Sequence, residues 1–150
     1  MQAQHIMKRD VITVKNTDKV KAVIEKFIQH GISGLPVIDD HNHIIGYISD
    51  GDIMRFIGKH KDITINIYSY VTIFKEQEEY DERVQKILEL NVMEVAKKSV
   101  LKIPYNEKVE DIAAILGKKH IKKLPVERDG KLVGIISRGD VIRESFKSLL

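Results

Sequence analysis

Two copies of one pattern decide the fold of this chain: Gly46-Tyr47-Ile48-Ser49-Asp50-Gly51-Asp52-Ile53 and Gly134-Ile135-Ile136-Ser137-Arg138-Gly139-Asp140-Val141. These copies lie 88 residues apart. Upstream of them, Ile32-x-x-Leu35-Pro36-Val37 recurs as Ile121-x-x-Leu124-Pro125-Val126, at an offset of 89. The offset changes at the turn 39–43, which is one residue longer than its counterpart. A spacing that shifts only at a turn indicates an internal duplication.

Each copy has the periodicities of a βαββα unit. In the first copy, short β-branched or apolar runs predict strands at 11–14, 35–38 and 44–48. Apolar residues at three- and four-residue steps predict a helix over 20–28, with Asp18 as its N-cap and Gly31 at its end. A second helix is expected over 52–57, opened by Ser49. The second copy repeats this order, from Val100 to the helix that begins at Ser137.

We expect three segments: a first repeat at 1–58, a linker with an entry helix at 59–91, and a second repeat at 92–150. The linker is largely apolar at 63–70, and 76–90 predicts an amphipathic entry helix of the second repeat, with Val84, Ile87 and Leu88 inward. One repeat of about fifty residues is too small to bury a core comfortably by itself. The sequence therefore predicts an α+β fold in which two βαββα repeats pack about a pseudo-twofold axis.

The composition is that of an ordinary globular protein. Apolar residues make up 43% and charged residues 31% of the chain, and the net charge of +3 does not by itself argue for nucleic acid. There is no cysteine, which excludes disulfides and thiolate metal sites. The chain has no run of about eighteen apolar residues, so no membrane span is predicted, and the first residues lack a signal-peptide pattern. We expect a cytoplasmic protein with no membrane partner.

The Ser-x-x-Asp motif admits two compatible interpretations. As a local structure, it is a capping box, in which Ser49 or Ser137 begins a helix and the Asp three residues later completes the cap. As a binding element, the same helix start offers free N–H groups and a partial positive charge to a phosphate. An ionised Asp only accepts hydrogen bonds, so its carboxylate can bind both hydroxyls of a ribose, which donate them.

Together these motifs resemble the CBS domain. Gly31-Ile32-Ser33-Gly34-Leu35-Pro36-Val37 with the Gly46–Ile53 stretch is similar to one copy, and His120-Ile121-Lys122-Lys123-Leu124-Pro125-Val126 with Gly134–Val141 to a second. The resemblance covers essentially the whole chain apart from the linker. It implies a CBS pair, also called a Bateman module, which senses energy state or a metabolite by binding an adenosine derivative. We expect AMP, ADP or ATP, and the sequence does not exclude S-adenosylmethionine or a dinucleotide. It implies no catalysis and no required metal, and it implies action through a partner protein that the sequence does not identify.

The resemblance also implies two unequal nucleotide sites. Family members hold ribose on the motif Asp, place the motif Ser toward phosphate, and lay adenine against the first strand of a repeat. The main site is expected to comprise Ile12, Ile32, Ser33, Gly34, Lys122, Lys123, Ile135, Ser137, Arg138 and Asp140. A second, weaker site is expected to comprise Tyr47, Ser49, Asp52, Leu101 and Ile121. Charge-assisted hydrogen bonds from the basic residues favour the cleft of Asp140.

Other functions compete with this one. The cluster Lys118, Lys119, Lys122 and Lys123 allows a nucleic-acid-binding basic protein, although no aromatic residues interleave with it for stacking on single strands. A weak nucleotide hydrolase is the other alternative, but neither a nucleophile with a base nor a Walker-type loop is evident. His41 and His43 could approach a metal, yet their polar turn is where exposed histidines ordinarily lie.

The resemblance finally implies a homodimer formed through the helices that follow Ser49 and Ser137. The expected contacts are Ile53, Phe56, Ile57, Val141, Ile142 and Phe146. The same side chains could instead serve only the internal core.

Overall fold

The computed structural model describes residues 1–59, 63–67, 70–74, 79–118 and 121–150, without the side chains of 63–74. The first repeat contains β1 (Val14–Lys15), α2 (Val20–His30), β2 (Gly34–Ile38), β3 (Ile44–Ser49) and α3 (Asp50–Ile57). The second contains β6 (Ile103–Pro104), α5 (Val109–Lys118), β7 (Lys123–Arg128), β8 (Lys131–Ser137), α6 (Arg138–Phe146) and η2 (Lys147–Leu149). The chain begins with α1 (Ala3–Ile6), and the repeats are joined through β4 (Ile63–Ile67), β5 (Tyr70–Phe74), α4 (Tyr80–Glu89) and η1 (Val92–Glu94).

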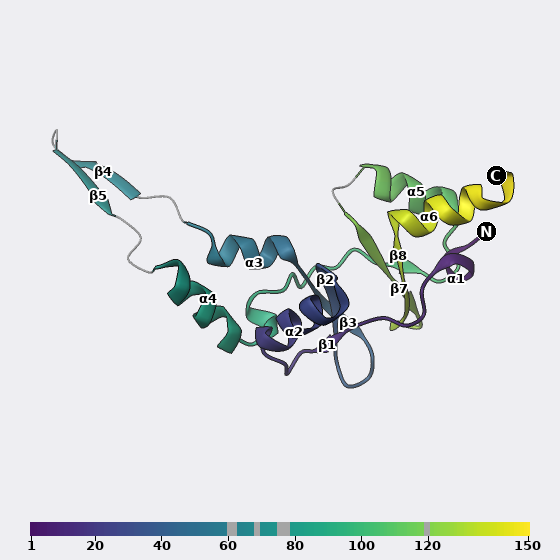
Figure 1. The fold of residues 1–150 in the computed structure, drawn as a ribbon, viewed down its shortest axis with the longest axis horizontal. Helices are drawn as coiled ribbons and strands as arrows, with labels where there is room; N and C mark the ends of the chain where they lie inside the picture. Colours follow the sequence, from purple (N-terminus) through teal and green to yellow (C-terminus); the bar gives the residue numbers. More distant parts are fainter. Residues whose placement is uncertain (60–62, 68–69, 75–78, 119–120) are drawn as a thin grey trace.

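Each repeat forms a three-stranded mixed sheet, in the orders β1-β2-β3 and β6-β7-β8. The first pair of each sheet is parallel and the second antiparallel. Figure 1 shows the two sheets near the middle of the molecule, with α3 and α6 leaving from the ends of β3 and β8. The predicted α+β fold of two repeats is confirmed.

The motif prolines explain why the first strand of each sheet is so short. Tyr47 exchanges its N–H and C=O bonds with Lys97 rather than with Pro36, which lies opposite it in β2. The ring nitrogen of Pro36 therefore faces the β1 side, where it has no hydrogen to donate. The parallel ladder begins only at Val37, which pairs with Val14, so the strand predicted at 11–14 is reduced to Val14–Lys15. Pro125 limits β6 in the same way.

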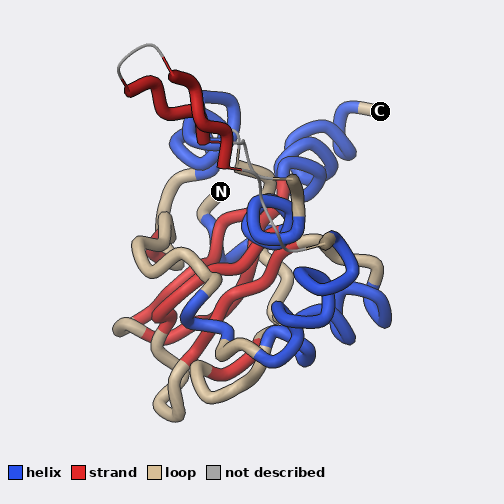
Figure 2. Tube along the Cα trace, turned by 90° about the vertical axis from the view of Figure 1, so that its left-hand side faces the viewer, coloured by secondary structure: helices blue, strands red, loops and turns tan. Residues whose placement is uncertain are grey.

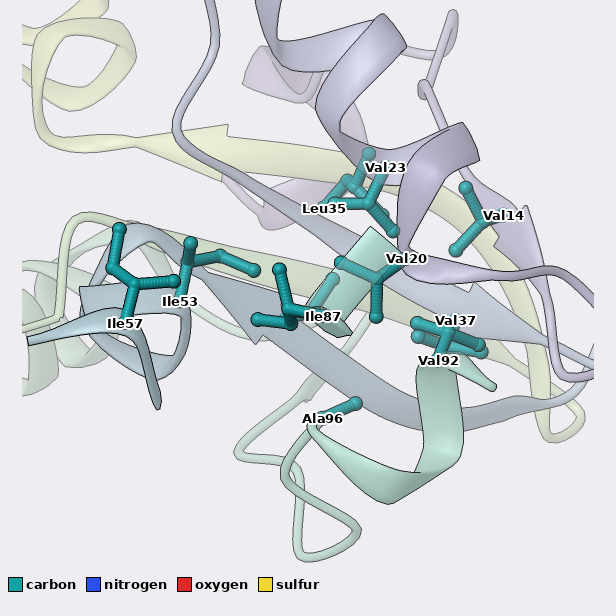
Figure 3. Close-up of a cluster of buried hydrophobic side chains, with 11 residues drawn as sticks. Val14, Val20, Val23, Leu35, Val37, Ile53, Ile57, Ile87, Val92 and Ala96 are labelled. Carbon is teal, nitrogen blue, oxygen red and sulfur yellow. The ribbon is translucent and has the colours of Figure 1, made fainter. Parts of the chain in front are cut away.

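The repeats exchange their flanking segments. The amino-terminal Ala3 and Ile6 pack in the core of the second repeat, whereas Ile87 and Val92 pack in the core of the first. Helix α4 contacts α2 and α3. The helix expected as the entry arm of the second repeat thus packs on the first, because its apolar stripe completes that core (Figure 3). Figure 2 shows helices above and to the right of the central strands, with the β4–β5 hairpin projecting at the upper left.

Several local expectations differ from the structure. Asp18 does not cap α2, whose N-cap is Lys19; its carboxylate instead accepts the N–H of Lys15 at 2.8 Å and closes the preceding turn. Helix α4 begins at Tyr80, and residues 76–78 of the predicted helix lie outside the described residues. Its buried positions are Arg83 and Ile87, while Leu88 is only partly buried. The apolar linker run is a hairpin, β4–β5, that projects beyond α3 and α4 in Figure 1.

The expected dimer contacts divide between core and surface. Ile53 and Ile57 are buried in the first core and Val141 in the second, so these three side chains serve the interior of the molecule. Ile142 and Phe146 are exposed, and Phe56 is half-buried. Among the described helices, none is long and apolar enough to cross a membrane.

Hydrogen bonds between the two sheets hold the repeats together at the turn 39–43. The N–H of Leu132 donates to the carbonyl of Asn42 at 3.0 Å, and the Asn42 side-chain amide donates to the carbonyl of Leu132 at 2.9 Å. Asn42 has a φ of 65°, a left-handed conformation that Asn adopts more readily than most residues. The extra residue of the first turn therefore places Asn42 where it can bridge the repeats.

Candidate functional site

Both Ser-x-x-Asp motifs form the predicted capping boxes. The Asp52 carboxylate accepts the Ser49 N–H at 3.0 Å and the Ser49 hydroxyl at 3.1 Å. The corresponding distances from Ser137 to Asp140 are both 2.9 Å. The motif therefore fixes the start of α3 and of α6, whatever else it binds.

Each motif carboxylate also pairs with an arginine three residues further along its helix. Arg55 binds Asp52, and the guanidinium of Arg143 lies 2.9 Å from Asp140. Burial opposes the charge of Asp140, but the bonds from Ser137 and Arg143 outweigh it and lower the pKa of this carboxyl. The sequence reasoning missed both arginines. Their common position, three residues after the motif Asp in each copy, was the signal that could have found them.

A cavity of about 430 Å³ lies between the repeats. From the first repeat it is lined by Ser33, Gly34, Tyr47, Ser49, Asp50, Gly51 and Arg55; from the following segment and the second repeat it is lined by Lys97, Ser99, Val100, Leu101, Ile121, Lys122, Lys123 and Pro125. Pockets of about 300–1,000 Å³ suit small organic ligands. Residues up to 92 positions apart in sequence thus build one compartment from both halves of the duplication.

The lining of the cavity combines apolar and basic side chains. Tyr47, Leu101, Ile121 and Pro125 supply the apolar surface. The Tyr47 hydroxyl lies over Gly34, so close that a β-carbon there would be 2.6 Å from its oxygen. Burial, with a smaller contribution from the charge of Asp50, raises the pKa of Tyr47 to about 12, which keeps the hydroxyl protonated at neutral pH.

The structure places two lysines with the other motif from the one that the sequence predicts. Lys122 and Lys123 were expected with Ser137, in their own repeat, but both line the cavity of Ser49. The Lys122 ammonium lies 3.7 Å from the Asp50 carboxylate of the other repeat. Packing of the repeats places the start of β7 opposite the start of α3, and this proximity cannot be read from spacing along the chain. Arg55, Lys97, Ser99 and Val100 are further lining residues that sequence reasoning missed.

Lys123 lies between the two motifs. Its strand position is opposite Ser137, although it also lines the cavity of Ser49. Burial and the neighbouring charge of Lys8 lower the pKa of its ammonium, and the charge of Asp140 partly offsets them. Lys123 is therefore near the ligand positions of both motifs.

The remaining predicted residues lie apart from this cavity. Asp52 lines a second hollow, of about 340 Å³, with Arg55, Phe56, Glu94 and Val95. Ile12 and Ile32 pack against the first core. Around the second motif, Ile135 pairs with Lys8, whose ammonium is 3.9 Å from Asp140, and Arg138 is exposed.

Histidines do not assemble a metal site in the part of the chain that the structure describes. No group of three metal-ligating His, Asp or Glu side chains occurs there. The rings of His41 and His43 are 6.2 Å apart, and His43 Nδ1 lies 3.2 Å from an Asp39 carboxylate oxygen. Lys119 and His120, part of the basic cluster and of the second motif, lie outside the described residues.

Comparison with known proteins identifies the architecture. The family model described as CBS domain matches residues 3–59 and 92–147. MJ1426, an uncharacterized protein of Methanocaldococcus jannaschii, is 30% identical over 95% of this chain and 89% of its own length. The chloroplastic CBS domain-containing protein CBSX1 of Arabidopsis thaliana is 31% identical over 93% of this chain, which spans only 61% of that protein.

A solved structure has the same fold. The crystal structure of CBSX2 in complex with AMP superposes with a TM-score of 0.73 at 24% identity, covering 97% of both chains. In sequence, the chain spans 60% of the chloroplastic CBSX2 of Arabidopsis thaliana, with 28% identity. The two family matches, the duplicated fold and these relatives establish that this chain belongs to the CBS-domain family.

Proposed function

We propose that this chain is a regulatory module that binds an adenosine nucleotide in the cavity beside Ser49 and acts without catalysis. The observation that carries the proposal is the cavity itself, which is lined by apolar side chains and by four cationic side chains, Arg55, Lys97, Lys122 and Lys123. The apolar side chains suit a purine, and the four cations suit a phosphate. The relative CBSX2, which was solved with AMP, supports the choice of ligand class.

Regulation follows from the position of the cavity between the repeats. A ligand that contacts both Ser49 and Lys122 binds better when the repeats are closely apposed, so it shifts the population toward that arrangement. A partner protein, or a second copy contacting the exposed Ile142 and Phe146, would then meet an altered surface. Partner and dimer are both part of the proposal.

Calorimetric titration with AMP, ADP and ATP tests the proposal. Replacing Lys122 by Gln removes a cation from the lining, where a charge-assisted bond to phosphate contributes about 1.5–3 kcal/mol. The Lys122→Gln variant should therefore bind AMP at least about tenfold more weakly. Lys98→Gln is the matched control, because Lys98 is exposed and adjacent to Lys97 but does not line the cavity.

Failure of the wild-type protein to bind any of these nucleotides would refute the proposal. Equal losses of AMP affinity in Lys122→Gln and Lys98→Gln would show that the cavity is not the binding site and that only the overall charge of the protein matters. Incubation with ATP and magnesium should leave ATP intact, and release of ADP would favour the hydrolase instead. Parallel titration of Asp52→Ala and Asp140→Ala decides which motif contributes more to affinity.

A further inference from the structure

The cavity is lined by a carboxylate as well as by cations. Asp50 is the first residue of α3, and it is the one acidic residue among the described side chains that line the cavity. Its N–H donates to the carbonyl of Ser33 at 2.8 Å, which fixes its backbone against the entry to β2. The side chain thus starts from a fixed point in the lining of the cavity.

This carboxylate uses the groups that a phosphate would use. One oxygen accepts the N–H of Gly51 at 2.7 Å, a free donor at the start of the helix. The other lies 3.7 Å from the ammonium of Lys122, across the boundary between the repeats. Helix start and lysine are the two kinds of anion-binding group that the cavity offers, and Asp50 is in contact with one of each.

The charge of Asp50 also extends toward the apolar side chains of the lining. The Tyr47 hydroxyl, whose pKa is raised chiefly by burial, is influenced in addition by this carboxylate. A ligand lying along Tyr47 with its phosphate toward Lys122 would therefore bring its negative charge close to that of Asp50. Like charges at a few ångströms repel, and solvent reduces but does not abolish this repulsion at a half-exposed side chain such as Asp50.

The second repeat supplies a natural comparison. Its capping box has the same hydrogen bonds, but the position equivalent to Asp50 holds Arg138. The backbone of the two motifs is thus alike, and the side chain after the motif Ser reverses the local charge. The difference between the motifs at this point is electrostatic rather than architectural.

We propose that Asp50 sets the charge selectivity of the cavity: its carboxylate stands in the phosphate position as an internal competitor that an anionic ligand must displace from Gly51 and Lys122. The inference rests on the proposed function, since it concerns the same cavity. Displacement is feasible because the Asp50 side chain is 49% exposed and its pair with Lys122 is exposed on both sides. The repulsion grows with each added phosphate, so Asp50 offsets part of the attraction from the cations and reduces the advantage of polyphosphates over adenosine ligands of low negative charge.

The test is a charge series of ligands against one isosteric variant. Asp50→Asn removes the charge but keeps an oxygen that can accept the Gly51 N–H. Adenosine, AMP, ADP and ATP are titrated calorimetrically into wild-type and variant protein in the presence of a chelator. Asp40→Asn is the matched control, because it removes the same charge from an exposed residue in the turn 39–43, outside the cavity lining.

The expected result is a gain that increases with ligand charge. Asp50→Asn should leave adenosine affinity unchanged, tighten AMP by about three- to tenfold, and tighten ATP by more. The gain should shrink in 1 M salt, where the screening length falls to about 3 Å. Asp40→Asn should show none of these changes. Asp50→Arg, which copies the second repeat, should tighten AMP further.

Two outcomes distinguish a failure of the charge-selectivity inference from a failure of the proposed function. If wild-type protein binds AMP but Asp50→Asn gains nothing for ATP over adenosine, or loses affinity, the charge-selectivity inference is overturned while the proposed function stands. If neither protein binds any of the four ligands, the proposed function fails and this inference fails with it.

Discussion

Gly34→Ala should distort the cavity by displacing Tyr47. A β-carbon at this buried position would lie 2.6 Å from the Tyr47 hydroxyl oxygen, 3.1 Å from Cε1 and 3.2 Å from Cζ. Ordinary van der Waals contacts begin at about 3.4 Å, so the ring must move by most of an ångström. The Tyr47 backbone cannot follow easily, because two 2.9 Å hydrogen bonds hold it to Lys97. The ring must therefore rotate away from Gly34.

The expected magnitude follows from the cost of overpacking. Inserting a methyl group into a packed region costs about 1–3 kcal/mol in the free energy of unfolding. Because Tyr47 lines the cavity, a displaced ring should also weaken AMP binding by about tenfold, equivalent to about 1.4 kcal/mol. Guanidinium unfolding measures the first quantity and calorimetric titration the second.

Three further variants test the displacement of Tyr47. Tyr47→Phe removes the closest atom, so the double variant Gly34→Ala/Tyr47→Phe should lose less stability than the sum of the single changes. Gly117→Ala, in α5, meets nothing within 4 Å and should stabilise the protein by about 0.5–1 kcal/mol. A Gly34→Ala protein with wild-type stability and wild-type AMP affinity would refute this account, as would strict additivity in the double variant.

Two other predictions concern the second motif and the bridge between the repeats. The lowered pKa of Asp140 means that its ionised form stabilises the fold above the ordinary carboxyl value of 3.8, and that this stabilisation is lost as the pH falls through the folded-state pKa. Asp140→Asn should therefore cost about 1–3 kcal/mol at pH 7, with the deficit shrinking toward pH 3 in unfolding titrations; a constant deficit would contradict it. Asn42→Ala should cost about 1–3 kcal/mol, because it loses the bond to Leu132 and strains a φ of 65°. Asn42→Gly keeps the backbone conformation and should cost less in the same denaturant titration, and equal costs would exclude strain.

Much of the fold could be predicted because its causes are local. The capping boxes at Ser49 and Ser137 need only residues three apart, and Gly31 ends α2 in the expected left-handed conformation with φ 62°. The limits of β1 could not be predicted, although Pro36 was known, because they depend on which strand faces the proline nitrogen. The repeat on which α4 packs could not be predicted for a similar reason, since an apolar stripe identifies a buried face but not the surface that covers it.

The sequence by itself determined the duplication, the order of elements in each repeat and the chemistry of the two Ser-x-x-Asp motifs, because these depend on short spacings. Only the tertiary structure decided which residues share a cavity. Packing of the repeats placed Lys122 3.7 Å from Asp50, and exchange of the flanking segments added Lys97 to the lining. Contacts between positions so distant along the chain arise from the burial of apolar faces between repeats, which no local pattern encodes. The charge of the cavity beside Ser49 is therefore a property of the assembled pair of repeats.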